Sequence, residues 1–93
     1  MKVRKTNEVV AALTKKGFEL KRKSNHCFYE LKINGKKSGI RTKVSHGNKT
    51  IKKGILSQMA TQIKLSNTEF ENFIDCPFTY NNLIDKLQKD NYI

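Results

Sequence analysis

Apolar positions recur along the chain with two different periods, and the first is helical. Between residues 6 and 16, Val9 and Leu13 are spaced as on one face of a helix. Thr6 stands where a capping residue belongs, and Gly17 stands where helices commonly end in the left-handed region. The pattern predicts a helix over residues 6–16.

The next segments alternate between apolar and polar residues, which is the period of a strand with one buried face. This alternation over residues 18–23, 26–33 and 40–44 predicts three strands. Ser24-Asn25 is a turn signal, and Asn34-Gly35 is the strongest short hairpin dipeptide. The three strands are therefore expected to form an antiparallel meander.

A second helical stripe follows the strands, and Thr50 precedes it as the expected cap. Its members repeat every four residues and are Ile51, Ile55, Met59 and Ile63. The order helix, three strands, helix predicts an α+β fold with both helices on one face of a three-stranded antiparallel sheet.

The tail continues in two short helical stripes. Ser66 and Glu69 have the spacing of a capping box, and Pro77 interrupts the pattern before a second stripe over residues 79–88. The tail has too few large apolar residues to hold a core of its own. We expect residues 1–65 to form the main domain and residues 66–93 a helical C-terminal extension packed on it.

Charge is distributed unevenly along the chain. Residues 1–54 hold sixteen Lys and Arg against three Glu, whereas residues 55–93 hold three Lys against five Asp and Glu. A segment this cationic favours an anionic partner, and phosphate backbones are the usual one. The basic residues do not fall on an amphipathic helix, which argues against a membrane surface.

Several other classes find no support in the sequence. No apolar run approaches the roughly 18 residues of a membrane helix, and no apolar stretch follows the N-terminal residues as in a secretory signal. Cys27 and Cys76 are far apart and form no metal-like pair, and the glycines form no phosphate-loop pattern. We expect a cytoplasmic protein with reduced thiols and without a metal ion or cofactor.

Strand phase brings His26 and Phe28 to the open face of the sheet, because Tyr29 and Leu31 belong to the apolar face. Cations of the neighbouring strands share the open face, and they are Lys21, Lys23, Arg41 and Lys43. An aromatic ring among cations suits RNA, since a base stacks on the ring while phosphates contact Lys and Arg. The plainer interpretation is a solvated, charged sheet face.

Two stretches, LTKKGFELKRKSNHCFYEL and VSHGNKTIKKGILSQMATQIKLS, resemble the HicA family of toxin–antitoxin toxins. The resemblance covers residues 6–65, and the tail is similar to the C-terminal extension of a longer branch of that family. It implies a fold like a double-stranded-RNA-binding domain. It also implies a stress-response toxin that cleaves mRNA as an endonuclease without a metal ion and is neutralised by a HicB-like antitoxin.

The resemblance assigns the family's catalytic histidine to His26, because Ser24-Asn25-His26 matches its Gly-Ser-His step. Cys27 stands where many members have a second histidine, so a role that depends on that second ring is absent here. A histidine suits removal of the 2′-OH proton, since its pKa lies near neutrality and neighbouring cations favour the neutral ring. His46 is either the general acid or a turn residue that donates a hydrogen bond before the second helix.

Two other functions would use the same features. One is a non-catalytic RNA- or DNA-binding module that uses the basic sheet face and leaves the nucleic acid intact. The other is an interaction protein whose basic surface docks an acidic partner. The first predicts affinity for nucleic acid without cleavage, and the second predicts a tight protein complex with negligible affinity for free RNA.

Overall fold

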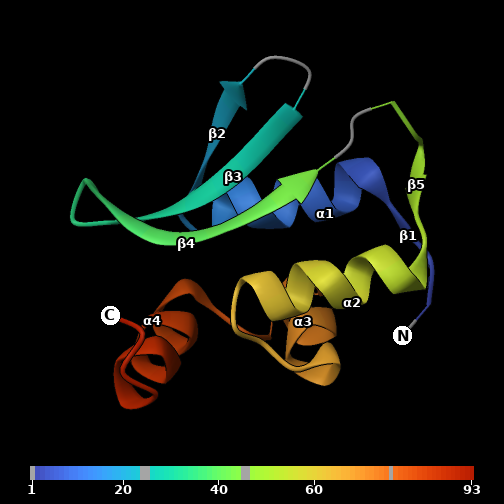
Figure 1. Cartoon of the computed structure of the whole chain (residues 1–93). Helices are drawn as coiled ribbons and strands as arrows, with labels where there is room; N and C mark the ends of the chain where they lie inside the picture. Colours follow the sequence, from blue (N-terminus) through green and yellow to red (C-terminus); the bar gives the residue numbers. More distant parts are fainter. Residues whose placement is uncertain (1, 24–25, 45–46, 76) are drawn as a thin grey trace.

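The computed structural model describes residues 2–23, 26–44, 47–75 and 77–93, without the side chains of Lys23 and His26. Its elements follow the predicted α-β-β-β-α order with additions at both ends (Figure 1). They are β1 (Arg4–Lys5), α1 (Thr6–Lys15), β2 (Phe18–Lys23), β3 (His26–Ile33), β4 (Lys36–Val44), β5 (Thr50–Ile51), α2 (Lys53–Gln62), α3 (Asn67–Ile74) and α4 (Tyr80–Lys89). The predicted α+β class is confirmed.

Strands β2, β3 and β4 form the predicted antiparallel sheet, in the order β2-β3-β4. Asn34 and Gly35 have φ angles of 53° and 78°, so both turn residues lie in the left-handed region that a tight hairpin requires. Pairing resumes directly after this turn, with Ile33 opposite Lys36. Strand β4 therefore begins at Lys36 and not at Ile40, where the alternation of apolar residues first becomes visible.

The start of α1 differs from the sequence prediction. Lys5 is the N-cap residue, and the hydroxyl of Thr6 donates a hydrogen bond of 2.7 Å to the carbonyl oxygen of Asn48 and caps no helix. The backbone N–H of Thr6 donates to the carbonyl oxygen of Lys49 over 2.9 Å. The prediction of a Thr6 cap is wrong because the helix follows β1 directly, and β1 is held against β5.

The start of α2 differs for the same reason. Thr50 and Ile51 pair with β1 as strand β5, so α2 begins at Lys53 with Lys52 as its N-cap residue. Ile55 is 48% exposed, and the expected four-residue stripe is wrong at that position. The apolar residues that α2 and the residue after it bury are Leu56, Met59, Ala60 and Ile63.

One hydrophobic core joins the apolar face of the sheet to the helices. In Figure 1, α1 lies behind the sheet and α2 runs below β4, while α3 and α4 form the lower layer. Phe73 of α3 packs edge-on against Phe18 of β2, with 5.9 Å between ring centroids. Leu83 and Leu87 of α4 are fully buried. Helices of the tail therefore share the core of the sheet.

The capping box predicted at the start of the tail is present, and an ion pair joins the N-terminal strand to the tail. Ser66 forms a complete capping box with Glu69 at the start of α3. The guanidinium of Arg4, in a side chain only 6% exposed, donates to Asp75 over 2.6 Å and to Glu8 over 2.7 Å. Among the described residues, no helix is long and apolar enough to cross a membrane.

Candidate nucleic-acid interface

The register of the sheet defines its open face row by row. Phe28 of β3 lies opposite Lys21 of β2 on one side and opposite Lys43 of β4 on the other. Directly opposed residues of antiparallel strands project to the same face. Three of the predicted contact residues therefore form one row across the sheet, with the aromatic ring in the middle.

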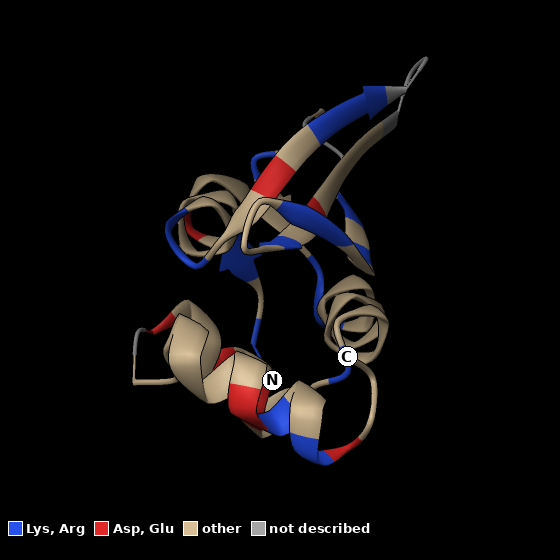
Figure 2. Cartoon of the chain, turned by 90° about the vertical axis from the view of Figure 1, so that its left-hand side faces the viewer, with Lys and Arg blue, Asp and Glu red and all other residues tan. Residues whose placement is uncertain are grey.

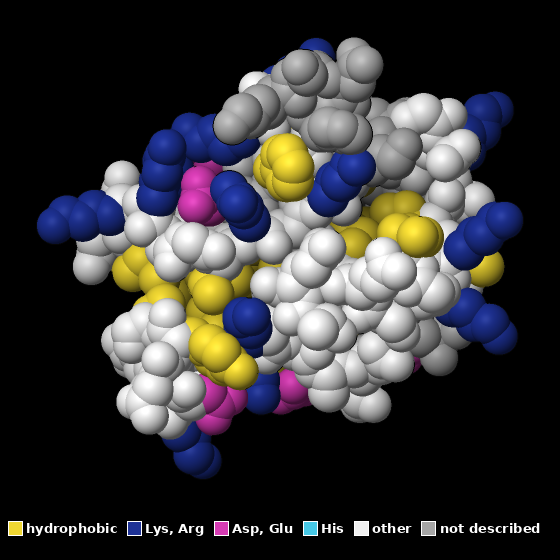
Figure 3. Space-filling model, in the orientation of Figure 1, with side chains coloured by type: hydrophobic (Ala, Val, Ile, Leu, Met, Phe, Trp, Pro, Cys, Tyr) yellow, Lys and Arg dark blue, Asp and Glu magenta, His cyan; other side chains and the backbone are white. Residues whose placement is uncertain are grey.

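Arg41 approaches the same aromatic ring from the next row. Its guanidinium carbon lies 5.7 Å from the centroid of the half-buried Phe28 ring, within the range of a cation–π contact. Figure 3 shows this face with a hydrophobic side chain between dark blue side chains. A ring with cations around it presents both a stacking surface for a base and positive charge for the adjoining phosphates.

Acidic residues limit the positive charge at one end of this face. Glu19 accepts a hydrogen bond of 2.8 Å from the ammonium of Lys21, and Lys32 lies 3.8 Å from the same carboxylate. The bond from Lys21 lowers the pKa of Glu19, and Glu19 in turn raises the pKa of Lys21. Lys21 thus meets a phosphate only in competition with Glu19, a restriction that strand phase alone did not reveal.

Of the two histidines, the structure describes the backbone of His26 only. His26 is the first residue of β3, where its backbone pairs with Lys23, the last residue of β2. The side chains of His26 and Lys23 lie outside the described part of the chain, as does all of His46. The backbone thus places His26 at the end of the sheet, two residues from Phe28 in the same strand.

Two other residues of β3, Cys27 and Tyr29, belong to the apolar side of the sheet. Tyr29 is 2% exposed, which confirms its prediction as a core residue, and burial raises the pKa of its phenol. Cys27 is a half-buried free thiol opposite Arg22 and Val44. Among the described residues, no group of three or more His, Cys, Asp or Glu is placed to hold a metal ion.

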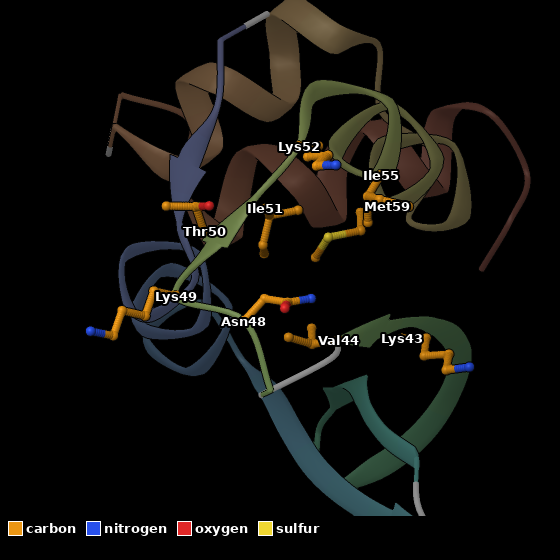
Figure 4. Close-up of a pocket in the computed structure, with 9 residues that line it drawn as sticks. All are labelled: Lys43, Val44, Asn48, Lys49, Thr50, Ile51, Lys52, Ile55 and Met59. Carbon is orange, nitrogen blue, oxygen red and sulfur yellow. The ribbon is translucent and has the colours of Figure 1, made fainter.

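A hollow beside the sheet was not predicted from the sequence. It lies between the end of β4, residues 48–52 and α2, and Asn48 extends into it (Figure 4). Asn48 follows Gly47, and no local signal in the sequence distinguishes it from an ordinary turn residue. Its position depends on the pairing of β1 with β5.

The distribution of charge agrees with a functional surface on the sheet side of the molecule. Figure 2 shows most of the blue Lys and Arg segments on the strands and loops of the upper half, with a few red segments among them, whereas red and blue are more evenly mixed on the lower helices. Fold and surface together define a small α+β protein with a cationic, aromatic-bearing sheet face.

A comparison with models of known protein families identifies the family of this chain. The family model described as the HicA toxin of bacterial toxin-antitoxin matches residues 6–65, which span α1 to the residues after α2. The chain therefore belongs to the HicA toxin family, the toxins of bacterial toxin–antitoxin systems. Searches of curated proteins and of solved structures found no match.

Proposed function

We propose that this chain is a metal-independent endoribonuclease toxin that cleaves mRNA, with His26 as the general base. The observation that carries the proposal is the position of His26 within the matched family segment. It begins β3 at the end of the sheet face on which Phe28, Lys43 and Arg41 gather. Sequence alternation predicts that His26 shares that face with Phe28.

The reaction needs little from the protein because RNA carries its own nucleophile. His26 removes the proton of the 2′-OH, and the 2′-oxygen then attacks the adjacent phosphorus. The bond from phosphorus to the 5′-oxygen breaks, and that oxygen takes a proton from a general acid, His46 or water. The products are a 2′,3′-cyclic phosphate and a 5′-hydroxyl, and one well-placed base contributes about 10²–10⁴-fold.

The residues around His26 are assigned to binding the RNA. Arg41 and Lys43 of β4 contact phosphates and stabilise charge that develops on the phosphoryl oxygens, and Lys21 and Lys23 contribute from β2 on the other side of β3. Phe28 receives a base by stacking.

The proposal includes the partner and the division of the chain. A HicB-like antitoxin neutralises the toxin, and both act in the cytoplasm. Residues 1–65 form the RNA-cleaving core and residues 66–93 an extension that stabilises it. The burial of Phe70 and Phe73 in the common core and the ion pair between Arg4 and Asp75 support this division of labour.

Cleavage of a single-stranded RNA in EDTA by wild type and His26→Ala tests the proposal. Circular dichroism first establishes that the variant is folded. We expect the variant to lose about 10²–10⁴-fold in rate. A parallel His46→Ala variant separates the two roles of that residue. If His46 is the general acid, the variant stays folded and cleaves RNA more slowly. If His46 is a turn residue, the variant is less stable.

The outcomes also separate the competing functions. Undiminished cleavage by folded His26→Ala contradicts the assignment of the base. A protein that binds RNA in a salt-dependent manner but never cleaves it is a binding module. A protein that ignores free RNA and binds an acidic partner tightly is an interaction protein.

A further inference from the structure

A pocket of about 470 Å³ borders the end of the sheet at which His26 lies. Its volume falls in the range of roughly 300–1,000 Å³ that is typical of small-ligand sites. Val44, one of its lining residues, pairs directly with Cys27, the neighbour of His26. Strand register thus places the pocket at the same end of the sheet as the backbone of His26.

More of the inner surface of the pocket is apolar than polar. Figure 4 shows Ile51 and Met59 on one side of the hollow and Val44 on the other. Each of these three residues is 7% exposed or less, so the edges of core side chains form the surface. Ile55 is 48% exposed and adds apolar area on the α2 side. Two apolar walls of this kind suit a flat aromatic ring.

Positive charge surrounds the pocket. Lys43, Lys49 and Lys52 belong to its lining, and no Asp or Glu is among the described residues that line it. Figure 4 shows Lys43 and Lys49 pointing away from the hollow on opposite sides. A polyanion that crosses the pocket would therefore meet an ammonium group on each side of a bound group, which is the arrangement that grooves for single-stranded nucleic acid use.

The side-chain amide of Asn48 extends into the hollow (Figure 4). Its backbone is held in place because its carbonyl oxygen accepts a hydrogen bond of 2.7 Å from the hydroxyl of Thr6. The following carbonyl, of Lys49, accepts from the backbone N–H of Thr6 over 2.9 Å. An amide offers a donor and an acceptor side by side, which matches the edge of a base.

We propose that this pocket binds one unstacked base of single-stranded RNA and that Asn48 reads the edge of that base. The base lies between the apolar walls while its flanking phosphates contact Lys43 and Lys49. A base must leave its helix to enter, so the substrate is single-stranded. The inference deepens the proposed function and rests on it, since a pocket at the same end of the sheet as His26 then selects one nucleotide of the RNA that is cleaved.

The test uses the complete chain with His26→Ala, so that RNA chemistry does not interfere. Each of the four ribonucleoside monophosphates is titrated while backbone amide signals are followed by NMR. We expect the largest shifts at Asn48, Ile51 and Ile55. One base should bind at least about tenfold more tightly than the weakest, as expected for a paired contact to a base edge. Asn48→Ala should remove that preference, and Asn81→Ala, an exposed asparagine on α4, should keep it.

Three outcomes of the titration overturn the proposal. Inorganic phosphate alone could produce the same shifts, which would define an anion site only. The largest shifts of the amide signals could occur at Phe28 and Arg41, which would place the nucleotide on the sheet face and not in the pocket. The third outcome is that no nucleotide binds. If the protein binds one base selectively but never cleaves RNA, the proposed ribonuclease function is wrong and the proposed base-binding pocket is supported. If the chain with its native His26 cleaves RNA but shows no base preference, the ribonuclease function is supported and the base-binding pocket is wrong.

Discussion

Gly17→Ala probes the point at which α1, the sheet and the tail meet. Gly17 follows the C-cap residue of α1 with φ at +91°. A Cβ atom there would lie 2.7 Å from Cε1 and 2.9 Å from Cδ1 of the Tyr80 ring. The carbonyl oxygen of Gly17 also accepts a hydrogen bond of 3.0 Å from the backbone N–H of Lys32. Neither the backbone nor the aromatic ring can move without disturbing a neighbour.

Two costs contribute to the expected loss of stability. An L residue in the left-handed region costs about 1–2 kcal/mol. Insertion of a methyl group against a packed ring costs about 1–3 kcal/mol. The sum, about 2–5 kcal/mol, is a large part of the roughly 5–15 kcal/mol that holds a domain folded. For a domain of this size Tm falls about 4–8 °C per kcal/mol, so we expect a decrease of at least about 8 °C.

Urea and thermal unfolding, followed by circular dichroism, measure the effect. Gly39→Ala is the matched control, because Gly39 has φ at +82° and no atom within 4 Å of its Cβ position. The control carries the conformational cost alone, and Tyr80→Ala combined with Gly17→Ala should remove the contact cost. If Gly17→Ala destabilises the protein no more than Gly39→Ala does, the argument from the Tyr80 contact is wrong.

Two further predictions concern the tail and the sheet face. Asp75→Asn should lower Tm at neutral pH, because it removes a charged partner of the buried Arg4 guanidinium. Arg4 holds the pKa of Asp75 below its usual range. The wild type therefore keeps this stabilisation above the ordinary carboxyl pKa of about 3.9 and loses it as pH falls through the lowered value. A difference in Tm between the two proteins that persists unchanged in acid contradicts this origin. Phe28→Ala should weaken binding of a non-cleavable 2′-O-methyl RNA at least about fivefold, by fluorescence anisotropy, since a stacked base contributes about 1–3 kcal/mol. Tyr92→Ala removes an exposed aromatic that has Lys64 over its ring at 5.1 Å, and an equal loss there would argue against a specific role of Phe28.

Local chemistry made much of this protein predictable. Strands 18–23 and 26–33 have the bounds that alternation predicted, and Asn34-Gly35 forms the expected turn because its residues tolerate positive φ. Gly17 and the capping box at Ser66 also occur as predicted. Each of these signals depends on residues within a few positions of one another, so a single sequence suffices to recognise it.

Tertiary contacts decided the rest. Pairing of β1 with β5 joins Arg4 and Lys5 to Thr50 and Ile51, which are far apart in the sequence, and it moved Ile51 from the expected helix into a strand. The same pairing leaves Ile55 exposed and brings Asn48 to the pocket beside the sheet. A periodic pattern states which residues prefer burial but not which partner buries them. The sequence by itself determined the sheet and the position of His26 in it, whereas the pocket exists only because distant segments fold together.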